Sequence, residues 1–123
     1  LLQLYFYGPD VVRVLKSPDS TLNIQESLSV IAKPSLIDFT VVEKDGLLEL
    51  LTSSLKINID LENGKMSFKN LDNNLLLQEK EAAIFTSIKD IKEDAFKVKQ
   101  TFKLEKDEVI YGLGQQQSNQ LNQ

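Results

Sequence analysis

The sequence contains no cysteine, no histidine and no tryptophan. Without cysteine, the chain can form neither a disulfide nor a thiolate metal site. Without histidine, it lacks the general base and the metal ligand that enzymes use most often. No apolar run is long enough to span a bilayer as a helix, because the longest one, over residues 47–51, is interrupted by Glu49. These absences exclude the commonest kinds of catalytic and metal-binding site.

The chain has 123 residues, a net charge of −4 and 41% hydrophobic residues. This length suits one domain with its own core, so we expect a single domain over residues 1–123. The acidic balance argues against a nucleic acid or an anionic membrane as partner. Because the sequence begins at Leu1 rather than at Met, we expect it to be a processed or cut piece of a longer protein.

Short runs rich in Val, Ile, Leu and Phe recur along the chain and are separated by turn residues. This pattern predicts an all-β fold, an antiparallel β-sandwich with little helix. The runs that we interpret as strands cover residues 1–7, 11–15, 28–32, 38–44, 47–53, 55–61, 66–71, 75–78 and 96–104. In the last run, lysines at every second position indicate a solvated face. Residues 78–83 are good helix formers and are also compatible with a helical turn.

Two dipeptides mark hairpin turns between apolar runs, Asp45-Gly46 and Asn63-Gly64. Both central positions of such a turn need residues that tolerate positive φ, which these pairs supply. Residues 72–74, Asp-Asn-Asn, superficially suggest a calcium loop. They lack the spaced ligands and the distal Glu of a calcium-binding hand, so we interpret them as a third turn.

Acidic residues gather in two clusters, which consist of Asp90, Glu93 and Asp94 and of Glu105, Asp107 and Glu108. Acid–base catalysis by a pair of carboxyl groups would need the two to face each other across a substrate, with a cleft that shifts the pKa of one of them. Both clusters fall in turns or at strand ends, where acidic residues usually solvate a loop. We therefore expect no catalytic, substrate-binding or metal-ligating residue in this chain, and no cofactor.

Aromatic side chains offer a second possible function, because they can stack on sugar rings. Tyr5 and Tyr7 share one face of the first predicted strand, and Phe6 lies on the other. Tryptophan, the residue best suited to that role, is missing. The other aromatic residues that we considered are expected to pack in the core; they are Phe39, Phe68, Phe85, Phe96 and Phe102.

The run Tyr111-Gly112-Leu113-Gly114 follows a strand-like stretch that starts at residue 107. Glycines one residue apart let the backbone turn sharply or pass close to another surface. The run is not a phosphate-binding loop, because no Lys-Ser/Thr pair follows and no helix signal opens after it. It is thus a backbone signature rather than a set of catalytic groups.

Segments at residues 9–18, 51–68, 75–79 and 102–115 follow one another in a characteristic order and spacing. In this ordered set the chain resembles the N-terminal β-sandwich domain of glycoside hydrolase family 31, the α-glucosidases and α-xylosidases. The block that matches near the end consists of Glu108, Tyr111, Gly112, Leu113, Gly114 and Gln115. We interpret this block as a structural motif at a domain junction. Gln115 stands where many members have Glu. A Gln at this position, with Gln117 and Asn122 further on, is closer to the bacterial α-xylosidase-like members.

The resemblance implies a sandwich of the galactose-mutarotase-like type, which in the family packs against a downstream (β/α)8 barrel. The barrel carries two Asp residues for retaining cleavage of an α-linked sugar, so an oligo- or polysaccharide is the expected substrate of the parent enzyme. The family's catalytic residues match no position of this chain. We therefore expect the chain alone to be inactive, to brace the barrel and to help shape the substrate entrance. Polysaccharide-degrading relatives suggest a periplasmic or extracytoplasmic location.

Three other functions remain open at this point. The chain is either an accessory domain of this kind or an independent carbohydrate-binding module, which would need a row of exposed aromatic side chains. A free-standing sugar mutarotase shares the fold type, but its chemistry relies on His, which this chain lacks. A structural β-sandwich without a carbohydrate role is the remaining alternative, because a fold does not fix a function.

Overall fold

The computed structural model describes residues 1–20, 29–89 and 94–109. The strands are β1 (Leu2–Gly8), β2 (Val11–Lys16), β3 (Thr40–Lys44), β4 (Leu47–Leu51), β5 (Lys56–Asp60), β6 (Met66–Lys69), β7 (Leu75–Lys89) and β8 (Asp94–Lys103). No helix occurs in the described ranges. Consequently, these ranges contain no helix that is long and apolar enough to cross a membrane.

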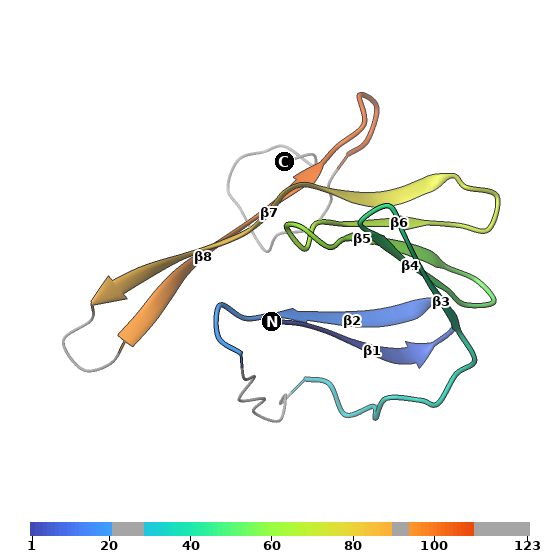
Figure 1. Cartoon of the computed structure of the whole chain (residues 1–123), viewed down its shortest axis with the longest axis horizontal. Coiled ribbons are helices and arrows are strands. Elements are labelled where there is room, and N and C mark those ends of the chain that lie inside the picture. The colour runs from blue at the N-terminus through green and yellow to red at the C-terminus, as the bar shows by residue number, and fades with distance from the viewer. Residues whose placement is uncertain (21–28, 90–93, 110–123) are drawn as a thin grey trace, which may run out of the picture.

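The strands form two antiparallel sheets, which can be followed in Figure 1. Strands β1 and β2 make a two-stranded hairpin, and β3 to β8 make a six-stranded meander in which each strand pairs with the next one along the chain. Side chains of the hairpin and of the meander meet in one core cluster. The predicted all-β antiparallel sandwich is therefore confirmed.

The predicted turns are present. Asp45 and Gly46, between β3 and β4, both have positive φ, 52° and 77°. This geometry is that of a mirror-image turn, whose twist matches that of two antiparallel strands. Gly64 has a φ of 72° between β5 and β6. Asn73, with a φ of 65°, lies in the turn between β6 and β7, so residues 72–74 form a turn as we interpreted them.

The core lies between the hairpin and the middle strands of the meander. Its buried members are Phe6, Leu50, Leu55, Ile57, Ile59 and Met66. Phe6 belongs to the hairpin, and the others belong to the stretch from β4 to β6. Ile57 is completely buried. The burial of such a side chain stabilises the fold by about 1.5–3 kcal/mol.

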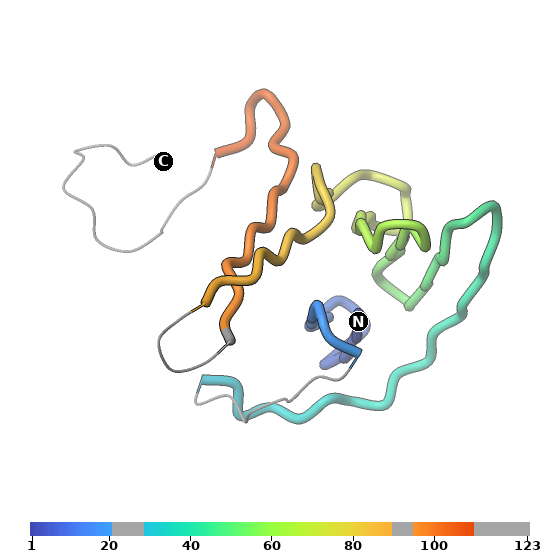
Figure 2. The backbone as a smooth tube through the Cα atoms, turned by 60° about the vertical axis from the view of Figure 1, so that its left-hand side comes forward, coloured from blue at the N-terminus to red at the C-terminus, as the bar shows by residue number. Residues whose placement is uncertain are grey.

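The strand expected over residues 28–32 is absent from the described part of that range. These residues belong to an extended segment, residues 29–39, which Figure 2 shows in cyan as it passes the hairpin. The N–H of Ser35 donates to the carbonyl of Phe6 in β1 at 2.8 Å. Pro34, next to it, has no N–H and interrupts any regular ladder. The prediction of a strand here is wrong, because an apolar run does not distinguish a strand from an extended connection.

Residues 78–83 belong to β7 and not to a helical turn. The strand continues through them with register shifts between Glu79 and Glu81 and between Glu81 and Ile84. Such shifts mark β-bulges, in which one strand has more residues than its partner. Hydrogen bonding to β8 outweighs helix propensity, which differs among these residues by less than about 1 kcal/mol each. The helical interpretation is therefore wrong.

The five phenylalanines expected in the core are Phe39, Phe68, Phe85, Phe96 and Phe102. Phe68 and Phe85 are half-buried, whereas Phe39, Phe96 and Phe102 are 47%, 42% and 45% exposed. For these three the expectation is wrong. For Phe96 and Phe102 of β8 the reason is that the hairpin is too narrow to cover this edge of the meander, whereas Phe39 precedes β3 and its ring lies 5.2 Å from that of Phe6. The uncovered edge leads to the candidate site.

Candidate functional site

One face of the meander is apolar across several strands. Strand pairing places Leu50, Ile57, Phe68 and Leu77 in one row, which crosses β4, β5, β6 and β7. Along this row Leu50 is 6% exposed and Ile57 is 0% exposed, but Leu77 is 39% exposed. The hairpin thus covers the middle of the row and leaves its β7 end open.

The hairpin covers only part of the meander because it is much narrower than the six-stranded sheet. Neighbouring strands lie about 4.8 Å apart, so a two-stranded hairpin spans about 10 Å and a six-stranded sheet about 29 Å. The hairpin lies over β4 to β6, where the buried side chains are found. Within the described residues the hairpin reaches β7 where Lys16 contacts Glu79, but it leaves Leu77 of β7 and Phe102 of β8 39% and 45% exposed. The extended segment of residues 29–39 contacts the hairpin at β1.

An apolar groove of about 480 Å³ lies between β2 at the edge of the hairpin and the uncovered part of the meander. Val12 and Val14 of β2 form one wall, and Phe68, Leu77 and Phe102 of the meander form the other. Contiguous exposed apolar surface of this kind usually marks a contact with another protein surface. The groove therefore suits a packing partner better than it suits a polar ligand.

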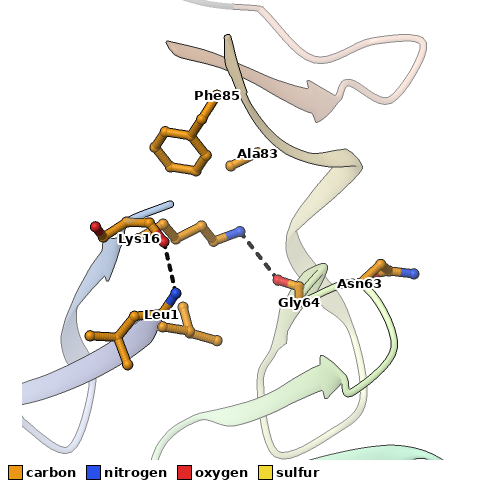
Figure 3. A pocket seen from close by; sticks show the side chains of 8 residues that line it. Leu1, Lys16, Asn63, Gly64, Ala83 and Phe85 are labelled. Atoms are coloured by element: carbon orange, nitrogen blue, oxygen red, sulfur yellow. Dashed lines mark hydrogen bonds between the residues drawn. The ribbon is translucent and has the colours of Figure 1, made fainter. Parts of the chain in front are cut away.

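A buried ion pair closes one end of the groove. The ammonium group of Lys16, at the end of β2, lies 2.6 Å from both carboxylate oxygens of Glu79 in β7. The two side chains are 15% and 5% exposed. The N–H of Met66 donates to Glu79 Oε2 at 2.9 Å, and Lys16 donates also to the carbonyl of Gly64 at 3.3 Å. Figure 3 shows this reach of Lys16 toward Gly64.

Sequence reasoning missed this ion pair, although the sequence carries a signal for it. Lys16 continues the inward positions of Val12 and Val14, because alternate residues of a strand share a face. Glu79 continues in the same way from Leu77. A charged residue at an inward position needs a partner of opposite charge, because burial of an unpaired charge is very costly. Two such positions of opposite sign therefore predict a pair.

A second polar contact joins the sheets at the opposite end of the hairpin. Thr52, which follows β4, is buried, and its hydroxyl donates to the carbonyl of Pro9 in the β1–β2 turn. The same hydroxyl accepts the N–H of Leu55 at 2.8 Å and that of Ser54 at 3.1 Å. Thr52 thus shapes the β4–β5 turn and holds the hairpin to it.

Two carboxyl groups of the described residues, those of Glu79 and Asp60, make contacts that stabilise the fold. Glu79 is paired with Lys16 and accepts the N–H of Met66. The N–H of Glu62, which donates to Asp60 Oδ1 at 2.9 Å, lowers the pKa of Asp60 below its usual value, and the amide of Asn63 adds to this effect. A carboxyl group held ionised in this way is unsuited to act as a general acid. Within the described residues no group of three or more acidic side chains could hold a metal ion.

Only part of the predicted junction motif falls within the described residues. Glu108 is exposed, and its N–H donates to the carbonyl of Glu105 at 3.1 Å. Its carboxylate accepts the N–H of Glu105 at 3.1 Å, which closes a turn after β8. Glu105, Asp107 and Glu108 are all exposed, as expected for acids that solvate a loop. Tyr111, Gly112, Leu113, Gly114 and Gln115 lie outside the described residues, and so do Asp90 and Glu93 of the other cluster.

The aromatic pair on the first strand lies on the outer face of the hairpin. Tyr5 pairs with Arg13 across the two strands, and Phe6 on the opposite face is buried. Tyr5 and Tyr7 are half-buried, and the hydroxyl of Tyr5 donates to the side-chain carbonyl of Gln3 at 2.9 Å. The pair occupies the predicted face, but it is not a fully exposed row.

Comparison with known proteins identifies the fold. All residues, 1–123, match the family model described as the glycosyl hydrolase 31 N-terminal galactose mutarotase-like domain. The structure superposes on the crystal structure of the GH31 α-xylosidase from Xanthomonas citri with a TM-score of 0.89 and 24% sequence identity. The match covers 98% of this chain and 13% of that chain. The predicted galactose-mutarotase-like sandwich is thereby confirmed, and the chain spans a small part of the length of that enzyme.

Proposed function

Because the chain belongs to the glycosyl hydrolase 31 N-terminal galactose mutarotase-like domain family, we propose that it is a non-catalytic domain of a retaining α-glycosidase. In this proposal the domain braces a downstream (β/α)8 barrel of the same polypeptide and helps to shape the substrate entrance. The parent enzyme acts on α-xylosyl or α-glucosyl linkages of an oligo- or polysaccharide. The run from Glu108 to Gln115 forms the junction toward the barrel.

The uncovered apolar face is the observation that supports a bracing role best. Leu77 and Phe102 are 39% and 45% exposed in the groove, and Val11 at its rim is 52% exposed. Interfaces between domains of one chain bury about 600–1,500 Å² and contain such apolar patches. The rest of the parent polypeptide would supply the missing cover. The absence of histidine and the pairing of Glu79 with Lys16 agree with a domain that performs no chemistry itself.

The activity is tested on two proteins, the 123-residue chain and the full parent polypeptide, each offered an aryl α-xyloside and an aryl α-glucoside. We expect the parent to hydrolyse at least one substrate and the chain to hydrolyse neither. Turnover by the pure chain would contradict the non-catalytic role. A parent that hydrolyses no α-glycoside would contradict the assignment to an α-glycosidase.

The bracing role is tested by Leu77→Asp in the parent polypeptide. If another domain covers Leu77, a charge placed there loses its water, and we expect a destabilisation of at least about 2 kcal/mol. The matched control is the same substitution in the 123-residue chain, where the side chain is 39% exposed and the loss of stability should be clearly smaller. Leu77→Met controls for shape in both proteins. An equal effect of Leu77→Asp in the chain and in the parent would argue against cover by a second domain.

A carbohydrate-binding module is the alternative, and the outward position of Tyr5 and Tyr7 favours it. Stacking on a sugar requires an accessible ring face. We expect no heat of binding when the 123-residue chain is titrated with xylo- and gluco-oligosaccharides, because both rings are half-buried. Millimolar or tighter binding that is lost in Tyr5→Ala, but kept in Phe39→Ala, would support the module instead.

A further inference from the structure

The ammonium group of Lys16 and the N–H of Met66 meet at the carboxylate of Glu79, and Lys16 also reaches the carbonyl of Gly64. Lys16 belongs to the end of β2, Gly64 to the β5–β6 turn and Met66 to the start of β6. The side chain of Glu79 accepts the N–H of Met66, a backbone donor at the beginning of its strand. Glu79 of β7 thus joins the end of the hairpin to the start of β6.

Immediately after Glu79 the long strand β7 no longer pairs with β6 and continues with β8 alone. Its pairing with β6 reaches Gln78, and the register shifts that mark bulges lie between Glu79 and Ile84. Beyond them β7 pairs with β8 alone, over residues 84–89 and 94–99, and we call this two-stranded part the arm. In Figure 1 the arm projects past the ends of the other strands.

Packing holds the arm only weakly. Four of its apolar side chains, Ile84, Ile88, Phe96 and Val98, are 46%, 45%, 42% and 58% exposed. A bulge increases the local bend and twist of a strand, so the direction of the arm is set where the bulges lie. Figure 3 shows Phe85 of the arm above the pocket that Lys16 and Leu1 line from below. The ion pair lies at the base of the arm, where a small rotation would move the tip furthest.

We propose that the Lys16–Glu79 ion pair is a positioning device, which fixes the direction of the arm by holding the bulged point of β7 to the end of β2. A buried ion pair contributes little net stability compared with apolar side chains of the same volume, but loss of one partner is strongly destabilising. The pair therefore determines one arrangement rather than strengthening the core. This inference does not depend on the activity of any parent protein.

The test measures the direction of the arm by electron paramagnetic resonance. The chain has no cysteine, so nitroxide labels can be attached at Ser53→Cys in the β4–β5 turn and Ser87→Cys in the arm, both at exposed positions. In the otherwise unchanged chain we expect a narrow distribution of distances between the labels. Glu79→Gln keeps an acceptor for the N–H of Met66 and removes the charge, and Lys16→Met keeps the apolar stem. Each is expected to broaden the distribution at least twofold.

The matched control is an exposed ion pair at the base of the arm. Lys99 lies 3.6 Å from Glu81, with side chains that are 64% and 48% exposed. Exposed pairs of this kind contribute about 0–1 kcal/mol, so Glu81→Gln and Lys99→Met should leave the distribution narrow. A broad distribution in these controls, or a narrow one in Glu79→Gln, would overturn the proposal.

Hydrogen exchange separates a positioning role from a general loss of stability. In Lys16→Met/Glu79→Gln, which leaves no unpaired charge, we expect peptides of β7 and β8 to exchange roughly tenfold faster or more, and peptides of β4 and β5 to stay within about twofold. Equal acceleration of all peptides would overturn the proposal. If Glu79→Gln does not fold, Lys16→Met/Glu79→Gln removes both charges and leaves no unpaired ion. In this double variant we expect the distribution of distances between the two labels to be broad. A narrow distribution would overturn the proposal as well.

Discussion

The middle strands and the outer strands of the meander follow the same sequence pattern but have different surroundings. In β5, Ile57 and Ile59 alternate with polar residues and are 0% and 4% exposed. In β8, Phe96 and Val98 alternate with lysines in the same way and are 42% and 58% exposed. Alternation identifies the face of a strand, but a second layer of structure decides whether that face is buried. In the described residues the hairpin supplies this layer for β5 and not for β8.

The largest expected effect contrasts these two regions directly. Ile57→Ala should lower the free energy of unfolding of the chain by about 2–5 kcal/mol, because it leaves a cavity in a packed core. Val98→Ala should change it by no more than about 0.5 kcal/mol, because the side chain is already in water. Urea unfolding of both variants measures the contrast. Similar losses in the two variants would mean that β8 is covered in solution.

A smaller effect is expected where the hairpin is held to the meander. Thr52→Val keeps the shape of the side chain but removes the hydroxyl, so that the N–H of Leu55 loses its acceptor and the carbonyl of Pro9 loses its donor. A buried group without its partner costs about 1–3 kcal/mol. Ser53→Ala at the neighbouring exposed position is the control and should be neutral in the same unfolding experiment. A neutral Thr52→Val would show that apolar contacts alone hold the hairpin.

The smallest effect concerns the turn that ends β5. The pKa of Asp60 is lowered from 3.8, first by the N–H of Glu62 and then by the amide of Asn63. The ionised form is therefore favoured in the folded chain, and its contribution is present above the unfolded pKa and lost as the pH falls through the lower folded pKa. We expect Asp60→Asn to be slightly less stable than the unchanged chain at neutral pH. Urea midpoints should show this gap closing below about pH 4.

A gap between Asp60→Asn and the unchanged chain that stays constant down to about pH 2 would contradict that account. It would indicate that the substitution acts on the turn geometry and not on the charge. Glu62→Gln, which keeps the backbone N–H that donates to Asp60, is the matched control and should leave the pH dependence in place.

Local signals in the sequence were sufficient to predict most strands and their turns. The Asp45-Gly46 and Asn63-Gly64 pairs stand where the backbone requires positive φ at Gly46 and Gly64, and alternation located the buried face of β5. These signals depend on residues that are neighbours along the chain. They failed at residues 29–32 and 78–83 and predicted no strand over residues 84–89 of β7, where the structure depends on whether another strand lies alongside.

The candidate site was less predictable, because it depends on which elements meet in space. Lys16 and Glu79 are 63 residues apart. Each stands at an inward position that the pattern marks as unusual, but the pairing follows only from the packing of the hairpin on the meander. Similarly, Phe102 and Leu77 were identifiable as apolar inward residues, but their exposure follows from the narrowness of the hairpin.

The central claim is that the open end of the apolar face is an interaction surface that the rest of a parent polypeptide covers. Hydroxyl-radical footprinting tests it without any substitution, by comparing the oxidation of Leu77 and Phe102 in the 123-residue chain and in the parent. Met66, which is 1% exposed, is the internal reference and should be protected in both proteins. The account predicts rapid oxidation of Leu77 and Phe102 in the chain and strong protection in the parent. Equally rapid oxidation in both proteins would contradict it.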